Sequence, residues 1–522
     1  MKKSKKRLLG FIALSVCLVL PAGAQQDKQA KLSLEECIAH AVKHNLGLVV
    51  QVYSSELADL AVSRAQEKFI PNLSFDYGKE NQNSASYSWL NASDIQSSSY
   101  MNYGSSINQL IPFGGKWTVS LNGYKSSSNS RFQTINPYFG STLTLSFSQP
   151  LLKDFGWQTS RKEILVARNN RDIAESDLKD ALLETVYSVE QAYWEYVYAI
   201  ESLNVRRQSL KLAEDLLDKS RKEVNIGTLA PKEILSAQAE VASRKADILQ
   251  GELQVKDEGD GLRTLINLPA TKSVEEIVPS DRPSFEKREI SFDQALATAL
   301  KNRPDLKSSE ISVKNRELDL SYAKNQTLPA LNLSASYWSP GISGDRILFL
   351  DNNPLTGTIV GTIPGGASTA MRDALRFKYN NWSVSLSLDV PLNTVFSRAA
   401  QAQAKAALDQ QVARMKNTEQ AAFLEIRSAV RAVQTNYERV DAYKAARELA
   451  EQKLAAEESK LKAGMSDNFR VLQYQRDLAQ ARTFELRAVI DYTLSLGKLD
   501  KAMGTSLDKK NIKLTDAWEV RS

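Results

Sequence analysis

The sequence is poor in the residues that build disulfide-stapled domains and interrupt helices. It has 2 cysteines and 2 histidines among 522 residues, with only 23 glycines and 15 prolines. Only Cys37 lies beyond the N-terminal segment 1–24, so no disulfide can form within a mature chain. The scarcity of helix-breaking residues indicates very long helices. No later stretch approaches about 18 consecutive apolar residues, so a membrane crossing by the mature chain has to use strands.

The N-terminus has the three parts of a secretory signal peptide. A cluster of basic residues precedes the apolar stretch Leu8–Leu20, and Ala22-Gly23-Ala24 follows it. The pattern predicts cleavage after Ala24. An alternative lipoprotein site at Cys17 is disfavoured because Val16 is bulky where a small residue is needed. Most of the formal charge of +6 leaves with this segment, and the rest of the chain shows no clustered basic surface that would predict nucleic-acid binding.

The mature chain contains an internal duplication. The segment Leu32–Lys43 resembles Ile290–Lys301, and a second match aligns Gly227 and Leu235 with Gly464 and Leu472. Both matches preserve chain order, which predicts a tandem repeat of about 240 residues. The expected organisation is a signal peptide (1–24), a first repeat (25–272), a linker (273–289), a second repeat (290–508) and a C-terminal tail (509–522).

Each repeat reads as a helix, a strand region, a very long helix, a turn and a second helix. Residues 157–226 and 392–463 contain no Gly or Pro, and helices of that length would run about 100 Å. Apolar stripes such as Leu182–Ile200 predict side-by-side packing of the long helices. Shorter helices are expected over four ranges: 34–70, 231–267, 292–326 and 467–503. Two of these end to end match one long helix.

The strand regions alternate polar and apolar residues with a period of two. Leu143, Leu145 and Phe147 alternate with Ser and Thr, and Val384–Val390 repeats this pattern. The polar inner set and the nearby tryptophans favour strands with a lipid face and aromatic girdles over a soluble sandwich. Those tryptophans are Trp89, Trp117, Trp157, Trp338 and Trp382.

The first strand region is longer than the second. The excess, 100–111 and 116–125 around the turn Pro112–Gly115, predicts an extra hairpin.

The ordered set of motifs resembles the TolC-like outer-membrane efflux family. The motifs are Leu34–Ala39, Ile70–Leu73, Gln149–Leu152 and Gly227…Leu235…Gln238, with second-repeat echoes at Phe292–Leu296, Leu328–Leu331, Val390–Leu392 and Gly464…Leu472…Gln475. The resemblance implies an α+β fold: a homotrimeric outer-membrane β-barrel with about four strands per protomer, continued by a long periplasmic α-helical barrel. We expect the extra hairpin to be an elaboration outside that wall; if it joins the wall, each protomer supplies six strands.

The resemblance also implies a function. The chain would be the outer-membrane exit duct of a tripartite efflux pump or a type I secretion system, supplied by an inner-membrane pump and a periplasmic adaptor, with no enzyme activity and no cofactor. A periplasmic coiled-coil adaptor and a structural envelope protein are the alternatives. An adaptor needs only one helical hairpin, and a coiled-coil protein does not explain the duplicated strands.

The two glycine turns are the candidate site. In this family, adaptor tips pack in grooves at the periplasmic mouth, which implies contacts at Gly227, Leu229, Leu235, Gly464, Met465 and Leu472. Several members carry carboxylates six and nine residues after the second glycine, and these constrict a cation-preferring entrance. Here those positions hold Arg470 and Gln473, while Glu233 lies on the first tip. We therefore expect Glu233–Arg470 pairs, within or between protomers, to help hold the mouth closed.

Other polar clusters are weaker candidates. Cys37, His40 and His44 share one helix face, but Cys37 and His44 are about 10.5 Å apart along the helix axis and cannot reach one zinc ion together. We therefore predict no metal site. The adjacent carboxylates Glu457 and Glu458 are expected to be solvated on a charged helix face.

Overall fold

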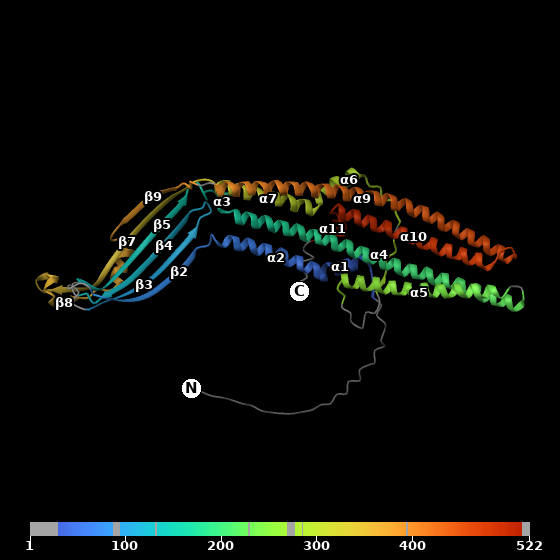
Figure 1. The fold of residues 1–522 in the computed structure, drawn as a ribbon, viewed down its shortest axis with the longest axis horizontal. Coiled ribbons are helices and arrows are strands. Elements are labelled where there is room, and N and C mark those ends of the chain that lie inside the picture. Colours follow the sequence, from blue (N-terminus) through green and yellow to red (C-terminus); the bar gives the residue numbers. More distant parts are fainter. Residues whose placement is uncertain are drawn as a thin grey trace, which may run out of the picture.

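The molecule is elongated, with a sheet at one end and helices running from it to the other end (Figure 1). The computed structural model describes residues 30–86, 94–130, 133–227, 230–268, 277–283, 285–392 and 395–513. The predicted signal peptide and Trp89 lie outside the described residues, and so do parts of the predicted linker and tail.

Two long helices form the frame of the molecule. Helix α4 (Lys162–Ile226) has 65 residues and α9 (Val395–Lys462) has 68, so each runs about 100 Å. The long helices predicted from the stretches without Gly and Pro are confirmed. Both begin slightly later than expected, and the short helix α3 (Trp157–Ser160) precedes α4.

Of the four shorter helices, two are single and two are broken. The helices near the far end, α5 (Lys232–Leu265) and α10 (Asn468–Ala502), are continuous. The ranges 34–70 and 292–326, predicted as single helices, each hold two. These are α1 (Leu34–His44) and α2 (Leu46–Glu67), then α6 (Phe292–Asn302) and α7 (Pro304–Asn325).

The breaks have different local causes. Asn45 has extended backbone with a ψ of 121°, and its side chain accepts hydrogen bonds from the N–H groups of Gly47 and Leu48. It therefore begins α2 as a capping residue. Arg303 has a ψ of 123° because it precedes Pro304, whose ring disfavours the helical conformation at the residue before it.

The two repeats share one layout. Helices α2 and then α5 pack along α4, and α7 and then α10 pack along α9. Figure 1 shows each short pair in line beside its long helix. The expected end-to-end stacking is confirmed, and the described residues form four helical columns.

The sheet is antiparallel and has seven strands. They are β2 (Asn72–Ala85), β3 (Ile95–Leu110), β4 (Lys116–Ser128), β5 (Ile135–Pro150), β7 (Ala330–Phe349), β8 (Ile359–Ile363) and β9 (Asn381–Asp389). The order is β2-β3-β4-β5-β7, with β9 paired to the first half of β7 and the short β8 paired to its end.

The extra hairpin lies inside this sheet, so the expectation that it stands outside is wrong. Strands β3 and β4 pair with each other, and they also pair with β2 and β5 on either side. The described part of the chain therefore contributes six long strands to the sheet rather than four. The physical reason is that the hairpin strands alternate in phase with their neighbours, so both of their edges form complete hydrogen-bond ladders.

A short helix, α8 (Ala367–Leu375), covers part of one sheet face. It packs on β5 and β7 and buries Ala370 and Ala374 completely. The close packing of α8 on β7 requires glycine at position 341, because a Cβ there would collide with the carbonyl oxygen of Ala370.

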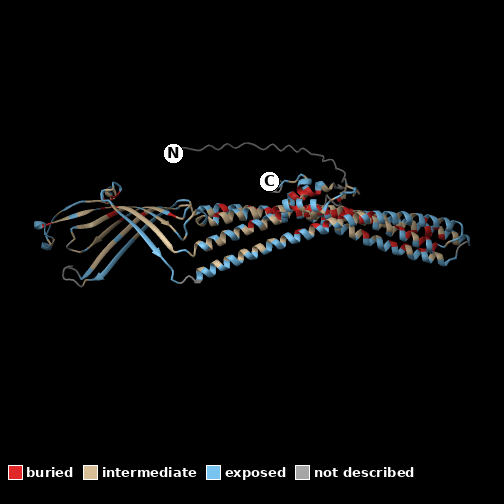
Figure 2. Cartoon of the chain, turned by 90° about the horizontal axis from the view of Figure 1, so that it is seen from above, coloured by how far each residue is buried: buried red, intermediate tan, exposed pale blue. Residues whose placement is uncertain are grey.

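The core lies along the helices. Figure 2 shows the buried residues concentrated from the middle of the helices toward the far end. The predicted stripe on α4 is part of this core, since Leu182, Val186 and Tyr193 are fully buried. A separate cluster around Ile426 and Tyr492 occupies the equivalent place in the second repeat.

The predicted linker is attached to this core rather than free. Its residues Ile277–Pro279 form β6, which pairs in parallel with β1 (Ala30–Leu32). The hydroxyl of Tyr196 on α4 donates to the Ile277 carbonyl oxygen over 2.7 Å. The short helix α11 (Ser506–Lys509) ends near the same region, with Leu507 in the core.

Candidate functional site

Two sharp turns at the end away from the sheet form the candidate site (Figure 1). Gly227 ends α4 with a φ of +85°, and Gly464 follows α9 with a φ of +74°. Glycine adopts this left-handed conformation without the steric cost that a Cβ imposes. The structure therefore places both predicted glycines at helix ends, where the chain reverses into α5 and α10.

The second turn is held by a set of polar contacts. Asp467 caps α10, because its side chain accepts a hydrogen bond from the Arg470 N–H over 2.9 Å. The buried side chain of Asn468 donates to the Ser220 hydroxyl on α4 over 2.8 Å. This second bond joins the tip of the second repeat to the long helix of the first.

Glu457 is buried, so the expectation that it is solvated is wrong. Its carboxylate accepts hydrogen bonds from Ser466 at 2.5 Å and from Lys460 at 3.3 Å. The Ser466 bond, followed by the bond from Lys460, holds the pKa of Glu457 below its ordinary value. The Gly464 turn brings Ser466 back over α9, which the sequence pattern alone does not predict.

The predicted contact residues divide into exposed and buried. Leu235 is 68% exposed and Met465 is 70% exposed, so both offer apolar surface at the tips. Leu472 is only 4% exposed and packs in the core between the four tip helices. The prediction that Leu472 contacts an adaptor is therefore wrong, because α10 directs this side chain into the core. Leu229 lies outside the described residues.

The predicted gate pair does not form within one protomer. Among the ion pairs of the described residues, Arg470 pairs with Asp467, with 4.0 Å between the nitrogen and oxygen atoms, and not with Glu233. Gln473 and Arg470 are exposed, while Glu233 is half-buried. The expected pair within one chain is therefore absent from these ion pairs, in which the Arg470 side chain reaches only Asp467. A pair between protomers stays a prediction.

Sequence reasoning missed a charge cluster near the tip that is built around the buried Arg244. Arg244 on α5 bonds Glu240 at 3.0 Å, and Arg476 on α10 bonds the other oxygen of Glu240 at 2.6 Å. Arg244 also donates to the Ser209 carbonyl oxygen on α4 over 2.5 Å. Burial would raise the pKa of Glu240, but the bonds from Arg476 and Arg244 outweigh it and the pKa lies below its ordinary value.

This cluster joins three helices from both repeats. The i, i+4 spacing of Glu240 and Arg244 was visible in the sequence, but such pairs are common on solvated helix faces. Only the packing of α10 against α5 buries this one, so no sequence signal distinguishes it.

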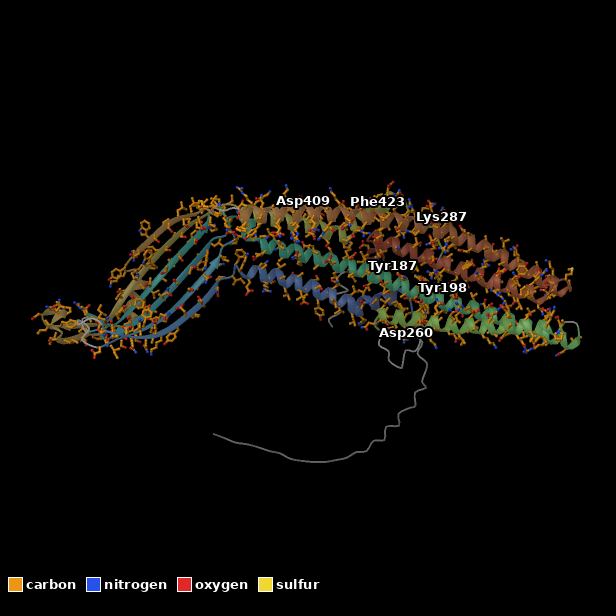
Figure 3. The ribbon with its side chains drawn as sticks, in the orientation of Figure 1. Tyr187, Tyr198, Asp260, Lys287, Asp409 and Phe423 are labelled. Carbon is orange, nitrogen blue, oxygen red and sulfur yellow. The ribbon has the colours of Figure 1, made fainter. Side chains whose placement is uncertain are left out.

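The middle of the helical part is joined in a similar way. On α4, the ring of Tyr187 lies under Lys501 and the ring of Tyr198 lies under Arg487, each cation 5.2 Å from the ring centre. Figure 3 labels both tyrosines on this helix. Arg487 also bonds Glu195 at 2.7 Å. Helix α10 is thus fixed to α4 along its length as well as at the tip.

The Cys37–His40–His44 face has a structural role. Cys37 is fully buried, and burial raises the pKa of its thiol to about 12. His40 donates from Nδ1 to the Ile266 carbonyl oxygen over 2.8 Å, which links α1 to the end of α5. Within the described ranges, no group of three or more His, Cys, Asp or Glu side chains is arranged to hold a metal ion.

In the part of the chain that the structure describes, no helix combines the length and the apolar character needed to cross a bilayer.

Comparison with known proteins identifies a family. The family described as outer membrane efflux protein matches residues 118–268 and 295–505. Nodulation protein T of Rhizobium leguminosarum bv. trifolii is 23% identical over 370 residues, which cover 70% of this chain and 73% of that protein.

Solved structures show the same fold. The CmeC outer membrane channel of Campylobacter jejuni has a TM-score of 0.63 at 17% identity, covering 92% of this chain and 90% of that one. The open state of the MtrE outer membrane channel of Neisseria gonorrhoeae has a TM-score of 0.62 at 19% identity, covering 91% of this chain and 89% of that one.

Proposed function

The chain belongs to the outer membrane efflux protein family, and from that premise we propose that three copies of it assemble into one channel. Proteins of this family are efflux channels of the outer membrane with a periplasmic helical domain, and they transport rather than catalyse. The alternatives of an adaptor and of a structural envelope protein are therefore set aside.

The observation that carries the assembly is the pair of open sheet edges. Within the described residues, β2 pairs only with β3, and β9 pairs only with β7. One sheet face is apolar; it is exposed toward the sheet edges, with Phe75 77% and Trp382 73% exposed, and α8 covers part of it over β5 and β7. An apolar sheet face suits lipid, but unpaired strand edges carry backbone groups that lipid cannot satisfy. Further copies must pair with these edges, and three copies bring twelve helical columns around one tunnel.

We further propose that the helical tips receive cargo from a periplasmic adaptor and an inner-membrane pump. The exposed Leu235 and Met465 beside the Gly227 and Gly464 turns offer apolar contacts for such an adaptor. This proposal rests on the family resemblance and on the exposure of these side chains.

The mouth of the channel lies between protomers in this proposal. Glu233 of one protomer faces Arg470 of its neighbour and holds the closed state, with the neutral Gln473 beside them. Arg470 and Gln473 stand here where several family members carry acidic rings, so cation preference should be weaker.

The experiment is to extract the protein from outer membranes, measure its mass in detergent and record it in planar bilayers. A mass of three copies and discrete channel conductance are expected, whereas the same protein dissociated by heat should give no conductance. A monomeric mass together with absence of channel activity would contradict the proposal.

A further inference from the structure

The six long strands align one apolar side chain each in a single row across the sheet. The register pairs Leu73 with Ile107, and the row continues without a break through the hairpin to β9. Its six members, in strand order, are Leu73, Ile107, Val119, Leu145, Tyr337 and Trp382. Since successive residues of a strand point to opposite faces, all six lie on one face.

The adjacent row is entirely polar and lies on the opposite face. Its members are Asn72, Asn108, Thr118, Ser146, Ser336 and Ser383. All are small or medium in size and uncharged. The hairpin strands β3 and β4 therefore have the same two-faced pattern as the strands on either side, in the same phase.

The hairpin also occupies the middle of the sheet rather than an edge. Strand β2 reaches the rest of the sheet only through β3 and β4. A barrel made from these protomers cannot leave the hairpin out without detaching β2. Closure runs between β2 of one copy and β9 of the next. These edge strands are antiparallel to each other, because β2 leads away from the helices and β9 leads back to them.

From these rows we propose that the trimer encloses a barrel of eighteen strands, six from each protomer, with a wide lumen lined by polar side chains. The inference rests on the proposed homotrimer and adds the size and chemistry of its exit. It assigns the pore to bulky hydrophilic cargo, such as compact peptides, in addition to small molecules.

The dimensions follow from strand and helix spacing. Strands about 4.8 Å apart, tilted by about 40°, give eighteen strands a circumference of about 113 Å and a backbone diameter of about 36 Å. By the same rule, twelve strands would give a circumference of about 75 Å and a backbone diameter of about 24 Å. Twelve helices packed about 9 Å apart have a circumference of about 108 Å. An eighteen-stranded wall thus continues the helical tunnel with almost no change in width.

The lining determines what can pass. If side chains take up about 5 Å on each side, the opening is about 25 Å, whereas a twelve-stranded wall leaves about 14 Å. A compact chain of roughly 40 residues has a radius of gyration near 9 Å and a diameter near 23 Å, so it fits only the wider pore. Besides Ser, Thr and Asn, the same face carries Asp76, Glu80 and Asp389 against Lys116, so its lining is polar with a small excess of carboxylates.

Two adjacent residues of the hairpin test its place in the wall. Thr118 belongs to the polar row and Val119 to the apolar row. In intact outer membranes, Thr118→Cys should react with a water-soluble maleimide and Val119→Cys should not, while Val119→Cys should react with a lipid-dissolved maleimide. Both variants would carry Cys37→Ala as background, and unaltered chains serve as the blank. Equal reaction of both variants with the water-soluble reagent would overturn the inference.

Strand counting and pore sizing complete the test. In lipid nanodiscs, electron cryomicroscopy should show eighteen strands, and neutral polyethylene glycols up to about 25 Å across should enter from the sheet end. Removing 95–128, which carries the hairpin, should lower that cut-off to about 14 Å and leave a trimer. A twelve-stranded trimeric channel in the unaltered protein would refute the wide pore but leave the proposed channel intact. A monomer without conductance would refute both.

Discussion

At the scale of single residues, the proposed closed mouth depends on whether the Arg470 side chain pairs with Asp467 of its own chain or with Glu233 of a neighbouring one. Within a protomer it lies 4.0 Å from Asp467, a distance at which an exposed pair contributes little. Glu233 is half-buried and Arg470 is exposed. Both side chains are therefore available for a pair between protomers.

We predict that Glu233→Ala and Arg470→Ala each raise the open probability of the channel about two- to fivefold, the range that fits an exposed ion pair. The double variant should add little beyond either single change, because both remove the same pair. Single-channel recording measures these values, with Gln473→Ala as the uncharged control. Additive effects, or no effect on gating, would contradict the paired gate.

At the scale of elements, the same break between stacked helices is stabilised differently in the two repeats. In the first, Asn45 caps α2 and donates to the Leu265 carbonyl oxygen at the end of α5. In the second, Arg303 bonds Asp305 and Glu425 and donates to the Ala502 carbonyl oxygen at the end of α10. Both repeats therefore have a break at the same place between stacked helices, but different side chains stabilise it.

We predict that Asn45→Ala loosens the start of α2 by about 1–2 kcal/mol, because both the cap and the bond to Leu265 are lost. Amide hydrogen exchange over 46–49 should accelerate about five- to thirtyfold. Asn45→Asp keeps the cap oxygen and loses the donor, so it should give a smaller change. Unchanged exchange in Asn45→Ala would show that tertiary packing alone holds this helix start.

At the scale of the whole molecule, a charge cluster around the buried Arg244 couples the two repeats near the tip. Glu240 and Arg244 belong to the first repeat, and Arg476 belongs to the second. The pKa of Glu240 is lowered, so its contribution to stability is present above the unfolded-state pKa of about 4.3 and is lost as pH falls below that value. Glu457, whose pKa is also lowered, adds to the same trend at the second turn.

We therefore predict that acid loosens the tips. Between pH 7 and pH 5 the open probability should stay constant, and below about pH 4.3 it should rise as Glu240 and Glu457 take up protons. Glu240→Gln should raise the open probability at pH 7 and reduce the acid response. The exposed Glu252, which pairs with Arg207, provides the control Glu252→Gln, for which the response should be unchanged. A full acid response in Glu240→Gln would contradict this role.

The sequence by itself determined the duplicated order of elements, the two long helices, the alternating strands and the glycine turns. These follow from local rules: Gly and Pro are missing from the two long helices, and polar residues alternate with apolar ones in the strands. The helix breaks were predictable for the same reason, because Pro304 and Asn45 are local signals of a helix boundary.

Only the tertiary structure decided features that depend on which elements meet. Strand pairing placed the hairpin of β3 and β4 inside the sheet. The alternation of polar and apolar residues indicates that a segment forms a strand, but not which strands it pairs with. Helix packing turned Leu472 inward and buried Glu457 and Arg244. Burial of a charged side chain depends on what packs over it and on whether a partner satisfies it, and that is a property of the assembled fold.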